Sequence, residues 1–130
     1  MRVEVPIGDV VDRVTILRLK EEHLRAPAAL ENVRAERAAL ESAWAAEGLP
    51  PLDSLPETAP LAACNRRLWE VEDALRACEA RGDFGDAFVA LARAVYQAND
   101  ERARWKREIS LRLGSRLVEE KSYAAGAAAR

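Results

Sequence analysis

The chain has 130 residues, 49% hydrophobic and 32% charged, so its length fits one domain over residues 1–130 and its composition excludes wholesale disorder. The formal net charge of −2 disfavours a nucleic-acid-binding protein, because such proteins usually have a basic excess. The first dozen residues include acids, and no apolar run approaches the length of a signal peptide or a membrane span. We therefore expect a cytoplasmic protein with no membrane span.

Four stretches with apolar residues at helical spacing, separated by Gly and Pro, predict the fold. We predict an all-α, antiparallel helical bundle of two helical hairpins, with helices at about residues 9–25, 28–47, 61–80 and 84–113. A connection at 49–60, which contains four prolines, joins the hairpins, and a short extended tail follows at 114–130.

The first predicted helix has apolar residues on two faces, which indicates that two neighbours cover it. One face contains Val10 and Val14, and the other contains Ile16 and the acidic Asp12. Asp12 is either an inward carboxylate with a cationic partner or a solvated acid in the first helical turn. Both interpretations stay open at the level of sequence.

The last predicted helix has a break in its apolar stripe. Arg102 and Lys106 fall in line with the Phe and Leu positions, and Asn99 lies at the edge of the same face. Inward cations require acidic partners, a ligand or a wet cleft, and Asp12 is the natural candidate partner. This helix would span roughly 45 Å, longer than the first hairpin. We therefore expect its end to project and to meet a second copy in a homodimer, with Trp105 at the interface.

Polar residues on three predicted helices form one candidate site. On the helix at 61–80, two polar side chains flank the apolar stripe and complete the set, which comprises Asp12, Asn65, Glu72, Asn99, Arg102 and Lys106. Three interpretations fit this set: a buried structural network, a contact between copies, or a pocket for an anionic small molecule that bears phosphate or carboxylate.

The sequence predicts no metal site and no cofactor. Cys64 and Cys78 are too far apart on one helix to form a disulfide and are expected to be buried free thiols. Carboxylate pairs such as Asp9 and Asp12 are spaced as in the magnesium sites of all-α nucleotide pyrophosphatases, but this spacing means little in a chain with 22 acids. A mutase of the chorismate type would use Arg and Lys in the same way, but the first helix lacks its Arg placement. No Gly-rich phosphate loop or activated nucleophile is present.

Four strings of the sequence are informative together: VPIGDVVDRVTILRLK, CNRRLWEVEDALR, LARAVYQANDERARWKREI and GSRLVEEKSY. From Val5 to Tyr123 they resemble a small bacterial family catalogued as a domain of unknown function. The resemblance implies an association with surface-polysaccharide and glycosyltransferase loci and implies no activity. It also implies that the family's pattern includes Asp12, Thr15, Asn65, Trp69, Glu72, Asn99, Asp100, Arg102, Lys106, Glu119, Glu120, Lys121 and Tyr123.

We therefore expect a helical binding or accessory module linked to bacterial envelope-glycan biosynthesis, acting as a homodimer or with a protein partner, rather than an enzyme. The alternative is a small-molecule enzyme or binder whose anionic ligand lies on Arg102 and Lys106, with Glu72 or Asp12 as the acid or base. The two hypotheses differ in the expected effect of Arg102→Ala. In the first, the substitution lowers thermal stability or dimerisation; in the second, it leaves the fold largely intact and abolishes a ligand-induced shift of the melting temperature.

Overall fold

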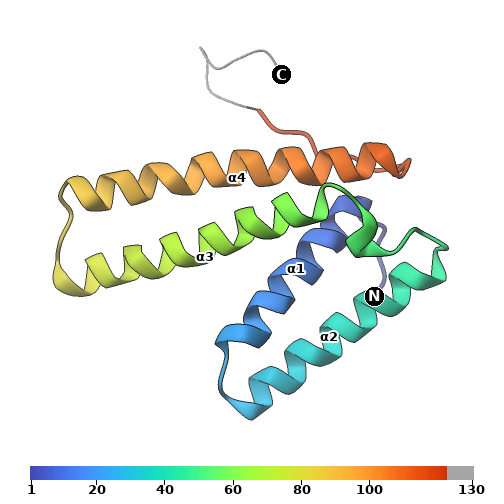
Figure 1. Cartoon of the computed structure of the whole chain (residues 1–130), viewed down its shortest axis with the longest axis horizontal. Coiled ribbons are helices and arrows are strands. Elements are labelled where there is room, and N and C mark those ends of the chain that lie inside the picture. The colour runs from blue at the N-terminus through green and yellow to red at the C-terminus, as the bar shows by residue number, and fades with distance from the viewer. Residues whose placement is uncertain (123–130) are drawn as a thin grey trace.

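The structure, a computed structural model, describes residues 1–122 as four α-helices and one 3-10 turn. These elements are α1 (Ile7–His23), α2 (Pro27–Ala46), η1 (Leu52–Ser54), α3 (Thr58–Arg81) and α4 (Asp86–Arg112). Figure 1 shows α3 and α4 as a long antiparallel pair and α1 and α2 as a shorter hairpin set at an angle to it. The predicted all-α bundle is confirmed. Residues 123–130, which include Tyr123 and most of the predicted tail, lie outside the described residues.

α1 is the central element of the bundle. It packs against α2 and also against both α3 and α4, which accounts for the apolar residues on two of its faces. None of the helices within residues 1–122 combines the length and the apolar character needed to cross a membrane.

Prolines explain two errors in the predicted helix boundaries. α2 begins at Pro27 rather than at residue 28, because Pro at the first helical position loses no intrahelical hydrogen bond. α3 begins at Thr58 rather than at residue 61, and Pro60 lies in its first turn, where backbone N–H groups have no intrahelical partner. The proline-rich connection therefore ends three residues earlier than predicted.

The other boundaries also differ from the prediction. α1 spans Ile7–His23 instead of 9–25, with Pro6 at its N-cap. α2 ends at Ala46 and α3 at Arg81, each one residue from its predicted end. α4 begins at Asp86 instead of residue 84, because Gly82 and Gly85 occupy the turn before it, and it ends at Arg112.

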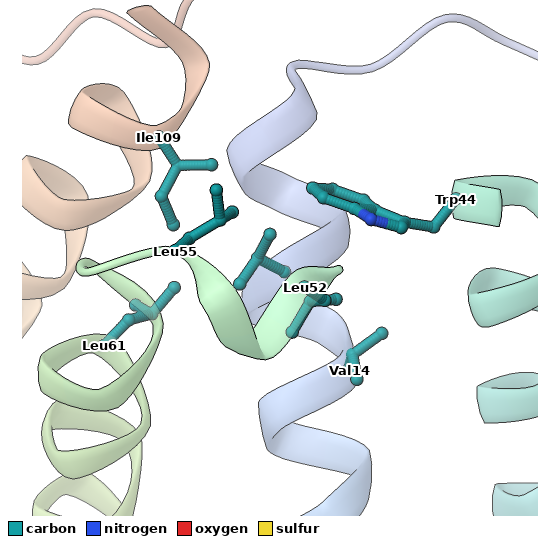
Figure 2. Close-up of a cluster of buried hydrophobic side chains, with 7 residues drawn as sticks. Val14, Trp44, Leu52, Leu55, Leu61 and Ile109 are labelled. Carbon is teal, nitrogen blue, oxygen red and sulfur yellow. The ribbon is translucent and has the colours of Figure 1, made fainter. Parts of the chain in front are cut away.

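The connection between the hairpins contributes directly to the hydrophobic core. Leu52, the first residue of η1, and Leu55, which directly follows η1, insert between α1 and the ends of α3 and α4, as Figure 2 shows. The cluster comprises Val11, Val14, Trp44, Leu52, Leu55, Leu61 and Ile109. The Trp44 indole N–H donates to the carbonyl of Pro50 at 2.8 Å, which holds the connection against α2. The core is therefore built at the corner where the two hairpins join.

The N-terminus of α1 lies directly against the backbone of α4. Pro6 supplies no side-chain cap, and the first N–H groups instead donate to hydroxyls near the end of α4: Ile7 N to Ser115 Oγ at 3.1 Å and Gly8 N to Ser110 Oγ at 2.9 Å. A Cβ at Gly8 would lie 2.0 Å from the carbonyl oxygen of Lys106. Glycine at this position therefore permits the close approach of the two helices.

The far part of the α3–α4 hairpin extends past the end of α1, as Figure 1 shows. In this projecting arm Phe84, Val89 and Tyr96 are each more than half exposed. Trp105, which the sequence suggested for a dimer interface, instead packs half-buried against the core cluster. The projecting end of α4 and its central part thus face different surroundings.

Candidate functional site

An ion pair between α1 and α4 forms the centre of the site. Arg102 donates from Nε to Asp12 Oδ1 at 2.8 Å and from Nη2 to Asp12 Oδ2 at 2.6 Å, which is a bidentate arrangement. The Asp12 side chain is 7% exposed and that of Arg102 is 29% exposed. Asp12, which the sequence proposed as the partner of an inward cation, therefore pairs with Arg102, and the pair joins helices that are far apart in the sequence.

α3 contributes a third member through Asn65. Its amide nitrogen donates to Asp12 Oδ1 and to Thr15 Oγ1, each at 2.9 Å, while the Thr15 hydroxyl donates to the backbone carbonyl of Asp12 at 2.8 Å. Asn65, Asp12 and Thr15 are all buried. The Asp12 carboxylate, the Thr15 hydroxyl and the Asn65 amide nitrogen all have partners, so the network fixes the mutual position of α1, α3 and α4.

A pocket of about 520 Å³ lies next to this network, between α1, α3 and α4. One wall is apolar and is formed by Ile16, Leu19, Leu68 and Trp69. The Trp69 ring packs against His23, with 4.6 Å between ring centroids and 32° between the ring planes. The pocket thus offers an aromatic and aliphatic wall.

The remaining lining of the pocket is polar and comprises Asn65, Glu72, Asp73, Arg76, Asn99 and Arg102. Within residues 1–122, neither the Nη1 group of Arg102 nor the amide of Asn99 makes a hydrogen bond, so both are available to a ligand. The nearest atoms of Glu72 and Asp73 are each 3.8 Å from Arg76, so these are weak ion pairs at the surface. The inner polar groups are fixed by the network, and the outer groups are free to adjust.

Lys106 belongs to a different branch of the charged network. Its ammonium lies 3.2 Å from Asp9 Oδ1 and 3.4 Å from Glu119 Oε2. Glu119 belongs to residues 115–122, which run back along α4 and which we call the C-terminal strap. Further pairs in the strap join Glu120 to Arg107 and Lys121 to Asp100. Lys106 thus anchors α1 and the strap to α4 and does not line the pocket.

The electrostatics of the pocket follow from these pairs. The hydrogen bonds that Arg102 donates to Asp12 hold the pKa of its guanidinium above the ordinary value, with burial acting in the opposite direction. Arg102 is therefore charged but already neutralised by Asp12. The two carboxylates of Glu72 and Asp73 then face one uncompensated guanidinium, that of Arg76, so the pocket is not cationic.

The cysteines do not supply a nucleophile near the pocket. Burial, together with the neighbouring Glu101 carboxylate, raises the pKa of the Cys64 thiol to about 11. A thiol with this pKa is protonated at neutral pH and unreactive. Cys78 is also a buried free thiol, and within residues 1–122 no group of three or more His, Cys, Asp or Glu side chains lies close enough together to hold a metal ion.

Five of the six predicted site residues lie together, and one does not. Asp12, Asn65 and Arg102 form the hydrogen-bonded network, and Asn65, Arg102, Glu72 and Asn99 line the pocket. Lys106 lies away from the pocket with Asp9 and Glu119. Whether the set binds a ligand stays a prediction.

Sequence reasoning from the residues alone missed the aromatic part of the pocket. Asn65, Trp69, Glu72 and Arg76 follow one another at steps of four, three and four, so they share one face of α3. That spacing could have identified Trp69 and Arg76 as pocket residues. Thr15 has no comparable signal, because its hydroxyl matters only through Asn65 on another helix.

Comparisons with known proteins give a family but no described relative. The sequence model of a family of unknown function, DUF6165, matches residues 1–129. Neither a curated protein nor a solved structure matched the chain. The chemistry of the pocket is therefore the main guide to function.

Proposed function

Because the chain belongs to DUF6165, a family of unknown function, its activity must be inferred from its own residues, and we propose that it is a helical binding module that holds a small polar ligand in the pocket between α1, α3 and α4. The observation that carries the proposal is the position of this pocket beside the satisfied network of Asp12, Asn65 and Arg102. A network of this kind preorganises the neighbouring groups for binding.

The ligand class we propose is a neutral, hydroxyl-rich ring such as a sugar. Hydroxyl groups both donate and accept hydrogen bonds, and the pocket offers donors on Arg102 and Arg76 and acceptors on Glu72 and Asp73. The apolar face of a sugar ring fits an aromatic wall, which Trp69 provides. The near balance of charge in the pocket gives no advantage to a strongly anionic ligand.

The biological setting comes from the resemblance described above. We propose that the protein acts in the bacterial cytoplasm as an accessory module of envelope-glycan biosynthesis, as a homodimer or with a protein partner. A pocket that binds a sugar would be compatible with that setting.

An anionic ligand is the second candidate, and one observation favours it. Arg102 Nη1 is free, and Arg76 lies on the same pocket. A phosphate or carboxylate at this point would, however, compete with Asp12 for Arg102 and would lie close to Glu72. An enzyme of this type would use Glu72 as its acid or base, because Asp12 is fully occupied by Arg102 and Asn65.

The test is calorimetric titration of the protein with methyl glycosides, sugar phosphates, nucleotide sugars and dicarboxylates. We expect a methyl glycoside to bind and the Asn99→Ala and Glu72→Gln variants to lose about tenfold in affinity, the equivalent of one hydrogen bond to the ligand. Each variant has a matched control of the same type outside the pocket: Asn32→Ala on α2 and Glu70→Gln on α3, both exposed.

The outcome separates the two candidates. If phosphorylated or dicarboxylate compounds bind and neutral glycosides do not, the ligand of the pocket is anionic and the proposal of a neutral sugar is wrong. Absence of binding across the panel, or equal losses in the control variants, would contradict a binding role for this pocket.

A further inference from the structure

The N-terminal half of α4 presents an exposed face with regular spacing. Asp86, Val89, Arg93 and Tyr96 follow one another at steps of three, four and three, which places them on one side of the helix. Val89 is 51% exposed and Tyr96 is 54% exposed. Alternating steps of three and four are typical of helix faces that pack against another helix. We call these four residues the arm face.

The charges of the arm face have no partner within residues 1–122, since neither Asp86 nor Arg93 takes part in an ion pair there. The C-terminal strap covers the continuation of the same side of α4, where Lys121 pairs with Asp100 and Glu120 pairs with Arg107. Charged residues on the covered half are thus paired, and those on the uncovered half are not.

The arm face is arranged symmetrically about its own midpoint. Asp86 and Arg93 lie equally far from a point between Val89 and Ala90, on opposite sides of it. If a second α4 runs antiparallel across this point, Asp86 of each copy meets Arg93 of the other, and Val89 lies at the centre. A surface that complements itself when reversed is what a two-fold contact requires.

We propose that the arm face is the surface through which two copies of this chain associate, with Asp86 of each copy opposite Arg93 of the other. This inference specifies the surface for the homodimer suggested under the proposed function and does not depend on what the pocket binds. The projecting arm extends beyond α1 (Figure 1), so α1 does not cover it. Val89 and Tyr96 on this part of α4 are therefore accessible to a second copy. Apolar residues at the centre and complementary charges around them match the usual arrangement of protein interfaces.

The test uses charge reversal and sedimentation velocity of the full chain over a range of concentrations. In Asp86→Arg, cations face cations at two places in the dimer, and in Arg93→Asp, acids face acids. We expect each single variant to raise the dimer dissociation constant at least about tenfold, because like charges directly opposite are repulsive. The double variant Asp86→Arg/Arg93→Asp restores both pairs and should dimerise like the natural chain.

A mixture of the two single variants is the sharpest form of the test. One chain then has two bases at these positions and the other has two acids, so only the mixed dimer has both pairs matched. We expect the mixture to dimerise although each variant alone does not. Circular dichroism shows whether the variants are folded, and Glu31→Arg, an exposed reversal on α2, is the matched control.

Three results would overturn the inference. The first is a natural chain that stays monomeric at every concentration. The second is single variants that dimerise as tightly as the natural chain, which would show that the dimer interface is another surface. The third is loss of dimerisation that neither the double variant nor the mixture restores. None of these results changes the calorimetric titration of the pocket, so failure of the dimer surface and failure of the binding proposal are distinguishable.

Discussion

At the scale of single residues, the Asp12–Arg102 pair is the feature that the sequence indicated most directly. A cation in line with Phe and Leu positions has to find an acid, and the number of inward acids on the other helices was small. The partner was therefore predictable from helix faces alone. The role of Asn65 as a bridge to Thr15 was not, because it depends on which edge of Asn65 faces α1.

Replacement of Arg102 tests how much the network contributes to stability. Arg102→Ala leaves the Asp12 carboxylate buried without its cation, and we expect the free energy of unfolding to fall by about 3 kcal/mol. Arg76→Ala is the control, because Arg76 lines the same pocket but makes only 3.8 Å contacts at the surface, so its loss should cost less than about 0.5 kcal/mol. Urea denaturation measures both values. Equal stability of the two variants would contradict the structural role of the network.

At the scale of secondary-structure elements, the helices were predictable and their joints were not. Periodic apolar residues located all four helices. The starts of α2 and α3 were predicted too late, because their prolines were treated as breaks although they lie in the first helical turn. The approach of α1 to α4 also escaped prediction, since a glycine near a helix start has many possible reasons. In the structure, Gly8 is the point where the α1 N-terminus meets the Lys106 carbonyl.

Substitution of Gly8 tests this joint between α1 and α4. A Cβ at Gly8 would overlap the backbone of α4, which cannot rotate away as a side chain can, so we expect Gly8→Ala to lower the free energy of unfolding by about 3 kcal/mol. The hydrogen bond from Gly8 N to Ser110 would also be lost as the helices separate. Gly85→Ala is the control, because its new Cβ would meet Asp83 at an ordinary 3.5 Å. Thermal unfolding of the two variants that gave equal losses would contradict the close approach.

At the scale of the whole molecule, the angle between the two hairpins creates the pocket. The sequence predicted both hairpins and the projection of the last helix beyond the first hairpin. It could not predict the angle between the hairpins, because that angle depends on the core at the joining corner. Leu52 and Leu55 lie in the stretch that the sequence classified only as a connection, and they help to set this geometry. The pocket therefore depends on packing between the hairpins, which the spacing of apolar residues within one helix does not predict.

The most direct test of the pocket is an NMR titration of the nitrogen-15-labelled protein that follows the indole N–H signals of its three tryptophans. Trp69 lines the pocket, whereas Trp44 is hydrogen-bonded to Pro50 and Trp105 packs against the core, so two signals serve as internal controls. With a methyl glycoside that binds, we expect a saturable shift of the Trp69 signal while the Trp44 and Trp105 signals stay in place. A Trp69 signal that does not move with any glycoside, or that moves only together with both controls, would contradict the proposal that this pocket binds a sugar.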